Sequence, residues 1–269
     1  MKIESIKEIQ VKIYNILKDI NAFCKEEQIM YMLSGGTCLG AVRENGFIPW
    51  DDDADIMMGR SEYRIFLEKF SQKYQGKYIV SSLYTDKNWE RPYAKIWDVH
   101  TKVIQKKSTE RSTGIGIDVF PIDIIPDVSV RRYMWIKQLK ILNILRNSAR
   151  RYEFYDGEKF KRIKHILGYI TRKKGARYYS EKMDRIACLY ENHNYKYVGA
   201  IMALNYWEKE IIGRELLNQV VDKKFVDDIF PIPLGYDAYL SNLYGDYMVP
   251  PSIHINHTDV QMVELEKNM

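Results

Sequence analysis

Hydrophobic residues recur at helical spacing at the start of the chain. Within residues 6–23, Ile, Leu and Phe return every three or four positions, which predicts an amphipathic helix with one buried face. An apolar run at residues 29–33 leads into Gly35 and Gly36 and predicts a strand that ends at a glycine turn. Residues 37–43 are then expected to form a short helix or a turn.

The next hydrophobic runs are short and rich in β-branched and aromatic residues, which is typical of strands. They cover residues 54–58, 78–83, 93–97, 102–105 and 116–125. Ser61 is the expected N-cap of a helix that continues to Tyr74. Pro121 lies inside the last run, and because proline donates no ladder hydrogen bond, we expect that strand to end near Phe120.

After about residue 131 the pattern becomes mostly helical, with an apolar face at residues 133–136 and more basic helices behind it. The expected fold class is α+β. A mixed-sheet core occupies residues 1–128, and a helical, basic region occupies residues 129–269.

Composition places the chain among folded globular proteins. Its 269 residues are 46% hydrophobic and 13% aromatic, which excludes disorder as the main state. No run approaches the ~18 apolar residues of a membrane span, and the charged N-terminal segment is not a signal peptide. Cys24, Cys38 and Cys188 have no metal or disulfide spacing, so a reducing, cytoplasmic setting is expected.

Charge is distributed unevenly. Residues 131–177 contain 15 Lys or Arg and 3 acids, a net charge of +12 in a chain whose total is +5. A basic block of this kind indicates an anionic partner: a phosphate-rich substrate, a membrane surface or nucleic acid. A pair of solvated helices is an equally weighted alternative. The chain has no nucleic-acid motif, so no nucleic-acid partner is expected.

Four acidic residues stand within five positions, at Asp51, Asp52, Asp53 and Asp55. On an extended strand, Asp53 and Asp55 point to the same face, where two carboxylates repel each other. A divalent cation with oxygen ligands, Mg²⁺ or Mn²⁺, removes this repulsion. The preceding glycine pair lets backbone N–H groups approach an anion closely. A phosphate cradle that faces a metal-binding pair of acids indicates phosphoryl or nucleotidyl transfer.

A third carboxylate is expected from the apolar segment at residues 114–123. Asp118 lies in the middle of this run, where an unpaired charge is costly. We interpret it as a third metal ligand or a general base, in preference to a purely structural hydrogen-bonding role. Asp123 follows a proline and is expected to be a turn or cap residue.

Three motifs then occur in order. They are Gly-Gly-Thr-Cys-Leu-Gly-Ala-Val-Arg at 35–43, Phe-Ile-Pro-Trp-Asp-Asp-Asp-Ala-Asp at 47–55 and Ile-Asp-Val-Phe-Pro at 117–121. Together they resemble the LicD/fukutin-type phosphotransferase family. The segment at 243–251, with His257 shortly after it, is similar to that family's closing motif.

The resemblance implies a nucleotidyltransferase-type fold and a reaction that moves a phospho-alcohol from a CDP-activated donor to a sugar hydroxyl. In bacterial members the alcohol is typically choline and the acceptor is a teichoic acid or lipopolysaccharide glycan. The resemblance also implies metal ligands at Asp53 and Asp55, with Asp51 beside them. Two alternatives remain: a nucleotidyltransferase with an NTP donor, and a non-catalytic nucleic-acid-binding protein.

Several side chains receive expected roles on this basis. The donor diphosphate is expected to contact Gly35, Gly36, Thr37, Arg43 and Lys95. Trp50 is expected to pack beneath the acidic turn, with stacking on the donor base as the alternative. Asp246 and His257 are further possible contacts.

The basic region at residues 129–269 is expected to form the acceptor side of the site. A lipid-linked glycan acceptor would bring it to the inner face of a membrane, where several Lys and Arg side chains attract anionic lipid. The face at residues 133–136 either enters that interface or, as the favoured alternative, packs on the core.

Overall fold

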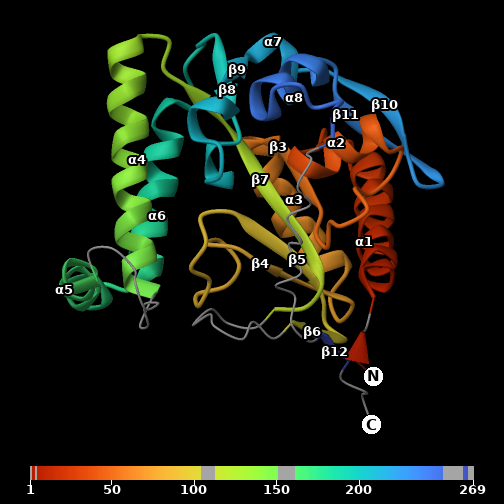
Figure 1. The fold of residues 1–269 in the computed structure, drawn as a ribbon, viewed down its shortest axis with the longest axis horizontal. Coiled ribbons are helices and arrows are strands. Elements are labelled where there is room, and N and C mark those ends of the chain that lie inside the picture. The colour runs from red at the N-terminus through yellow and green to blue at the C-terminus, as the bar shows by residue number, and fades with distance from the viewer. Residues whose placement is uncertain (1, 4, 104–112, 151–160, 251–262, 266–269) are drawn as a thin grey trace.

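The computed structural model describes residues 2–3, 5–103, 113–150, 161–250 and 263–265. Its centre is a curled, mixed sheet in the order β2-β3-β7-β5-β4, to which β8 is joined through β7 and β9 through β8 (Figure 1). Parallel pairing joins β3 to β7, and the other pairs of this sheet are antiparallel. Its strands are β2 (Met32–Leu33), β3 (Asp55–Gly59), β4 (Tyr78–Ser81), β5 (Ala94–Asp98), β7 (Gly116–Ile125), β8 (Tyr197–Gly199) and β9 (Ile212–Gly213).

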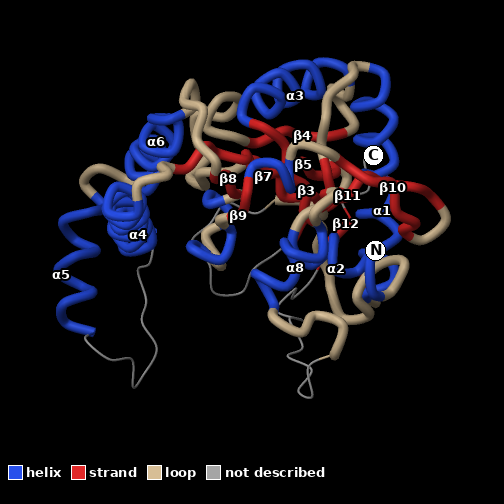
Figure 2. Tube along the Cα trace, turned by 90° about the horizontal axis from the view of Figure 1, so that it is seen from above, coloured by secondary structure: helices blue, strands red, loops and turns tan. Residues whose placement is uncertain are grey.

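Helices cover both faces of this sheet. In the view from above, α3 (Arg60–Lys73) lies on one side of the strands, and α2 (Gly35–Arg43) and α8 (Tyr236–Tyr244) lie on the other (Figure 2). The long helix α1 (Ile6–Glu26) confirms the predicted amphipathic segment, because its apolar positions are buried and Ser5 caps its first turn. Together these elements enclose the main hydrophobic core.

Strand β7 is longer than its prolines suggested. It runs through Pro121 to Ile125, so the expectation that it ends near Phe120 is wrong. Strand β5 pairs with β7 up to Val119, and β8 pairs with it from Asp123 onward. Pro121 falls in the interval between these two partners, where its missing N–H breaks no ladder hydrogen bond on that side.

A second expectation also fails, because α3 begins two residues earlier than predicted. Gly59, the last residue of β3, is its N-cap, and the Ser61 hydroxyl donates to Glu62 Oε2 at 2.7 Å. The first helical residue, Arg60, is buried and forms a two-pronged ion pair with Asp123 of β7, at 2.8 Å for each bond. Asp123 is therefore a buried ion-pair residue and not the expected cap.

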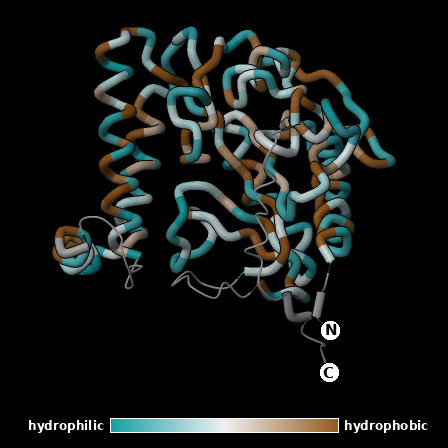
Figure 3. The backbone as a smooth tube through the Cα atoms, in the orientation of Figure 1, coloured by the Kyte–Doolittle hydropathy of each residue, from teal (hydrophilic) through white to brown (hydrophobic). Residues whose placement is uncertain are grey.

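The second half of the chain is mostly helical but also completes the sheet. Helices α4 (Ser129–Arg150) and α6 (Ala176–Ala187) pack side by side, and α5 (Lys161–Arg172) lies at the far edge of the molecule, with hydrophobic and hydrophilic positions on it (Figures 1 and 3). Strand β8 pairs with β7, so the sheet crosses the expected boundary at residue 128. Among the residues that the structure describes, no helix has the length and apolar character needed to cross a bilayer.

Smaller elements close the fold. Strands β10 and β11 form an antiparallel hairpin beside α1, and β1, β12 and β6 form a small separate sheet. The bounds are β1 (Lys2–Ile3), β6 (Thr101–Val103), η1 (Cys188–Tyr190), η2 (Ile201–Ala203), η3 (Trp207–Glu210), α7 (Arg214–Leu217), β10 (Val220–Phe225), β11 (Asp228–Pro233) and β12 (Val263–Leu265). The α+β class and the mixed-sheet core predicted from the sequence are confirmed.

Candidate functional site

Three neighbouring strands bring the predicted charged residues together. Asp55 at the start of β3 is in register with Asp118 of β7. On the other side of β7, Lys95 of β5 is in register with the same Asp118. Since residues in register on adjacent strands present their side chains on the same face, the three groups are neighbours although 63 positions separate the two acids.

The first turn of α2 lies opposite these acids. Gly35 has a φ of +50°, a conformation that favours glycine, and a methyl group at its Cα would lie 3.4 Å from Asp55 Oδ2. A methyl group at Gly36 would lie 3.1 Å from Asp51 Oδ2. The glycine pair therefore lets the positive end of the α2 dipole approach two carboxylates closely.

Thr37 holds Asp55 in place. Its Oγ1 accepts a 2.8 Å hydrogen bond from the Asp55 backbone N–H, and the Ser34 N–H donates to the Asp55 carbonyl at 3.0 Å. The Thr37 side chain is buried. The structure thus places Thr37 as a support for the strand that carries Asp55, whereas the sequence predicted a contact with the donor diphosphate.

The acids repel each other strongly. Burial raises the pKa of Asp55 well above its usual value, and the charges of Asp53, Asp118 and Asp51 raise it further, while Lys95 lowers it. Asp53 lies in the loop two residues before Asp55 and is exposed, so only Asp55 belongs to the strand itself. This cluster of oxygen ligands at the end of a strand, with one member open to solvent, fits a divalent cation.

Asp118 already has cationic neighbours. Lys95 Nζ lies 2.9 Å from Asp118 Oδ1, and Arg91 Nη1 lies 3.8 Å from Asp118 Oδ2. No group of three His, Cys, Asp or Glu side chains within the described part of the chain is arranged to hold a metal ion. Mg²⁺ in proteins often takes only one or two carboxylates and completes its shell with substrate phosphates and water, so the expectation of Asp53 and Asp55 as ligands does not require a third carboxylate.

Tyrosines from distant segments form one wall of the site, and sequence reasoning missed them. The Gly35 N–H donates to Tyr239 Oη at 3.2 Å, and Tyr239 Oη also lies 3.1 Å from Ser34 Oγ. Tyr244, one turn later on α8, has its hydroxyl 3.6 Å from the position of a Gly35 methyl group. Its ring meets that of Tyr206 edge to face at 5.3 Å. Only the similarity of residues 243–251 to a family motif pointed to this segment.

A buried carboxyl group lies behind this wall. Glu210 of η3 is 3% exposed, and its Oε2 has no hydrogen-bond partner among the described residues. Burial raises the pKa of Glu210 to about 8. Its charge in turn contributes to the raised pKa values of Tyr239 and Tyr244.

The remaining predicted residues lie elsewhere. Arg43 is at the opposite end of α2 from the glycines, about 12 Å along the helix, where it binds Glu44 and the Tyr247 carbonyl. Trp50 packs against the main core, as expected. Asp246 is an exposed residue after α8. His257 is outside the described residues.

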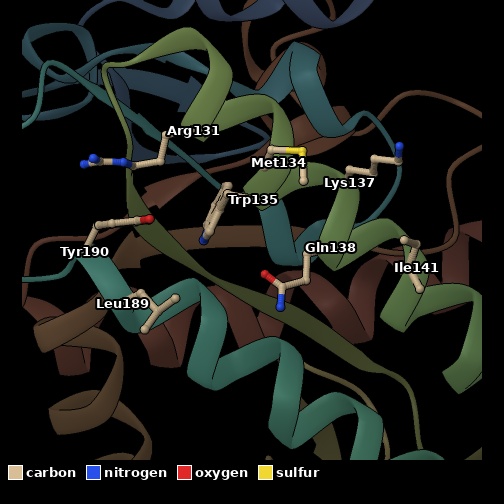
Figure 4. Close-up of a pocket in the computed structure, with 8 residues that line it drawn as sticks. All are labelled: Arg131, Met134, Trp135, Lys137, Gln138, Ile141, Leu189 and Tyr190. Carbon is tan, nitrogen blue, oxygen red and sulfur yellow. The ribbon is translucent and has the colours of Figure 1, made fainter.

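A separate pocket lies between α4 and η1 (Figure 4). Trp135 and Gln138 of α4 face Leu189 and Tyr190 across it. It shares no lining residue with the acid cluster, so it does not replace that cluster as the candidate site.

A mixed sheet with carboxylates on adjacent strands, opposite a helix that starts with two glycines, defines a nucleotidyltransferase-like domain. Residues 28–144 match the family model described as LicD/FKTN/FKRP, nucleotidyltransferase domain. Residues 28–144 therefore match the nucleotidyltransferase domain of this family, which confirms the resemblance seen in the sequence.

Individual relatives agree with this assignment. The chain is 29% identical, over 93% of its length and 94% of the relative's, to the lipopolysaccharide cholinephosphotransferase LicD of Haemophilus influenzae. Over a segment of 46 residues it is also 44% identical to uncharacterized proteins of Rickettsia prowazekii and Rickettsia typhi, a match that covers 17% of this chain.

Proposed function

We propose that this chain transfers phosphocholine from a CDP-activated donor to a sugar hydroxyl of a cell-surface glycan and releases CMP. The observation that carries the proposal is the register of Asp55 with Asp118, with Asp53 beside them and the glycine turn of α2 opposite. The chain is a phosphotransferase of the LicD type, given its domain and its full-length similarity to a cholinephosphotransferase.

The proposed cofactor is Mg²⁺ or Mn²⁺, held by Asp53 and Asp55 with Asp51 nearby. A divalent ion there would offset the negative charge of a diphosphate and favour departure of CMP. Burial, and after it the charges of Asp53, Asp118 and Asp51, raise the pKa of Asp55, and this supports the assignment because a divalent cation beside these carboxylates would favour their charged forms.

The protein's own groups supply the rest of the chemistry. The acceptor oxygen forms a bond to the phosphorus that carries choline, and the bond from that phosphorus to the CMP oxygen breaks. Lys95, which pairs with Asp118 at 2.9 Å, is proposed to neutralise negative charge on the leaving phosphate. Asp118, held between Lys95 and Arg91, either completes the metal shell or takes the proton of the acceptor hydroxyl.

The acceptor is proposed to be a lipopolysaccharide or teichoic acid glycan, which can be lipid-linked. The name of the Haemophilus relative supports lipopolysaccharide. The proposed location is the cytoplasm, at the inner face of the membrane.

A membrane contact through the basic region is part of this proposal, and we propose helix α5 as its site. Trp135 and Ile136 are each 3% exposed and pack in a second core cluster, so the face at 133–136 does not enter the interface as a unit. Helix α5 has the required character instead. Its exposed apolar residues are spaced along one face: Ile163, Ile166, Tyr169 and Ile170.

The proposed reaction is tested with purified protein, Mg²⁺ and a panel of donors: CDP-choline, CDP-ribitol and the four NTPs, each with lipopolysaccharide or teichoic acid as acceptor. Among these donors, only CDP-choline should give CMP and a phosphocholine-modified glycan, as detected by mass spectrometry of the products. Release of pyrophosphate from an NTP would instead support the alternative nucleotidyltransferase. Activity without added divalent metal after chelation would contradict the cofactor assignment.

A further inference from the structure

A buried arginine near the acid cluster keeps unused hydrogen-bond donors. Arg146 of α4 is 5% exposed, and its Nη2 donates to Asn147 Oδ1 at 3.0 Å. Its Nε and Nη1 have no hydrogen-bond partner in the part of the chain that the structure describes. Burial lowers the pKa of Arg146 to about 10. A buried guanidinium group without partners is costly unless a ligand supplies them.

Arg146 belongs to a cationic group that reaches the candidate site. Burial raises the pKa of Tyr93 and the charges of Arg91 and Arg146 both oppose this rise, and the charge of Arg91 adds to the burial that lowers the pKa of Arg146. Arg91 donates to Tyr93 Oη at 3.1 Å and lies 3.8 Å from Asp118. Arg150, one turn after Arg146 on α4, has its Nε 4.0 Å from Glu90 Oε2. The end of α4 therefore lies beside the loop that carries Glu90 and Arg91.

The loop that carries Glu90 and Arg91 is held rigidly against the helices. Arg177 of α6 donates to the carbonyls of Leu83 at 2.8 Å and Asp86 at 2.6 Å. Ser180 of the same helix donates to the Glu90 carbonyl at 2.5 Å. Arg177 shows how a structural arginine in this region is satisfied, namely by backbone carbonyls. Arg146 has no such carbonyl partner among the described residues for two of its three nitrogens.

We infer that Arg146 and Arg91, with Arg150 beside them, bind a phosphate group of a substrate next to the acid cluster. The planar guanidinium fork matches the tetrahedral oxygens of phosphate, and a dry, preorganised site strengthens each charged hydrogen bond. The inference rests on the proposed function in one respect: the acid cluster beside the bound phosphate is taken to be the site of transfer. The phosphate belongs either to the CMP half of the donor or to the acceptor glycan.

Titration calorimetry of the full chain at constant ionic strength tests this inference. Arg146→Met is compared with wild type and with Lys140→Met, which removes an exposed charge from the same helix. The probes are CMP, cytidine and, with CMP saturating, inorganic phosphate. If the donor supplies the phosphate, Arg146→Met weakens CMP binding about tenfold or more and leaves cytidine unchanged. If the acceptor supplies it, CMP affinity is kept and the binding of inorganic phosphate is lost.

Two outcomes would overturn the inference: wild-type affinity of Arg146→Met for both CMP and phosphate, or an equal loss in Lys140→Met. Arg150→Met serves as the second variant if Arg146→Met does not fold, and the same losses are expected of it. These measurements need no turnover, so they separate failure of the phosphate site from failure of the proposed reaction, which the donor panel tests.

Discussion

Asp55 and Asp118 occupy paired positions on two parallel strands. The charge of Asp118 adds to the burial that raises the pKa of Asp55, while Asp118 itself is paired with Lys95. A protein that needed only a stable sheet would gain by replacing one of these acids, because like charges on adjacent strands are destabilising. Their pairing, opposite the first turn of α2, is the feature on which catalysis is expected to depend.

Replacing either Asp53 or Asp55 with Asn should lower kcat by about a thousandfold, which corresponds to ~4 kcal/mol. The physical reason is loss of a metal ligand and of the charge that the metal balances. The melting temperature should stay the same or rise, because repulsion within the cluster decreases. Steady-state kinetics and thermal unfolding check this, with Asp222→Asn, an exposed acid on β10, as the control. Near-normal turnover of Asp55→Asn would remove the basis of the proposed mechanism.

Thr37 should prove to be a support for Asp55. Thr37→Val removes the acceptor of the Asp55 N–H and should lower the free energy of unfolding by about 1 kcal/mol. It should also lower kcat about tenfold, because the carboxylate loses its fixed position. Thr37→Ser keeps the hydroxyl and should retain most of both properties. A loss in Thr37→Ser but not in Thr37→Val, which keeps the methyl group, would point to methyl packing and not to the hydrogen bond.

Glu210 should make the stability of the protein depend on pH. Its pKa is raised from 4.5 to about 8, so the folded state holds the proton more tightly than the unfolded chain. The tighter proton binding contributes fully to the free energy of unfolding below about pH 4.5. This contribution is lost as the pH rises through about 8, at up to ~1.4 kcal/mol per pH unit.

Glu210→Gln should not show this loss, so its stability relative to wild type should increase between pH 5.5 and 7.5. Urea unfolding at several pH values measures the difference. The exposed Glu68→Gln provides the control and should follow wild type at every pH. Parallel curves for wild type and Glu210→Gln would show that the carboxyl group is not held neutral by burial.

Helix α5 should mediate binding to anionic membranes. In co-sedimentation with vesicles that contain phosphatidylglycerol, the Ile166→Glu, Ile170→Glu double variant should bind at least tenfold more weakly than wild type, because each substitution puts a charge into the interface. Ile65→Glu, at an exposed isoleucine of α3, should bind as wild type does. Binding that is insensitive to salt, or unchanged in the double variant, would exclude this face.

Local patterns predicted the centre of the site, and long-range packing determined the rest. The apolar run around Asp118 and the acids after Trp50 are visible in short windows, so both strands were located, although β7 continues past the predicted end at Phe120 and Asp53 lies outside β3. Tyr239 and Tyr244 approach Gly35 from about 200 positions away, and no local periodicity reports such a contact. Arg91 reaches Asp118 only because α6 fixes its loop. Ser61 was misjudged because β3 passes directly into α3, which leaves Gly59 as the cap.

The uninterrupted course of β7 past Pro121 bears on how the polypeptide can be dissected. Its first half holds Asp118 against β5, and its last three residues pair with β8, which comes from beyond residue 190. A fragment truncated at residue 128 would leave that terminal stretch as an open edge and would also remove Asp184, a partner of Arg60. Expression of the N-terminal half alone is therefore expected to give aggregated material.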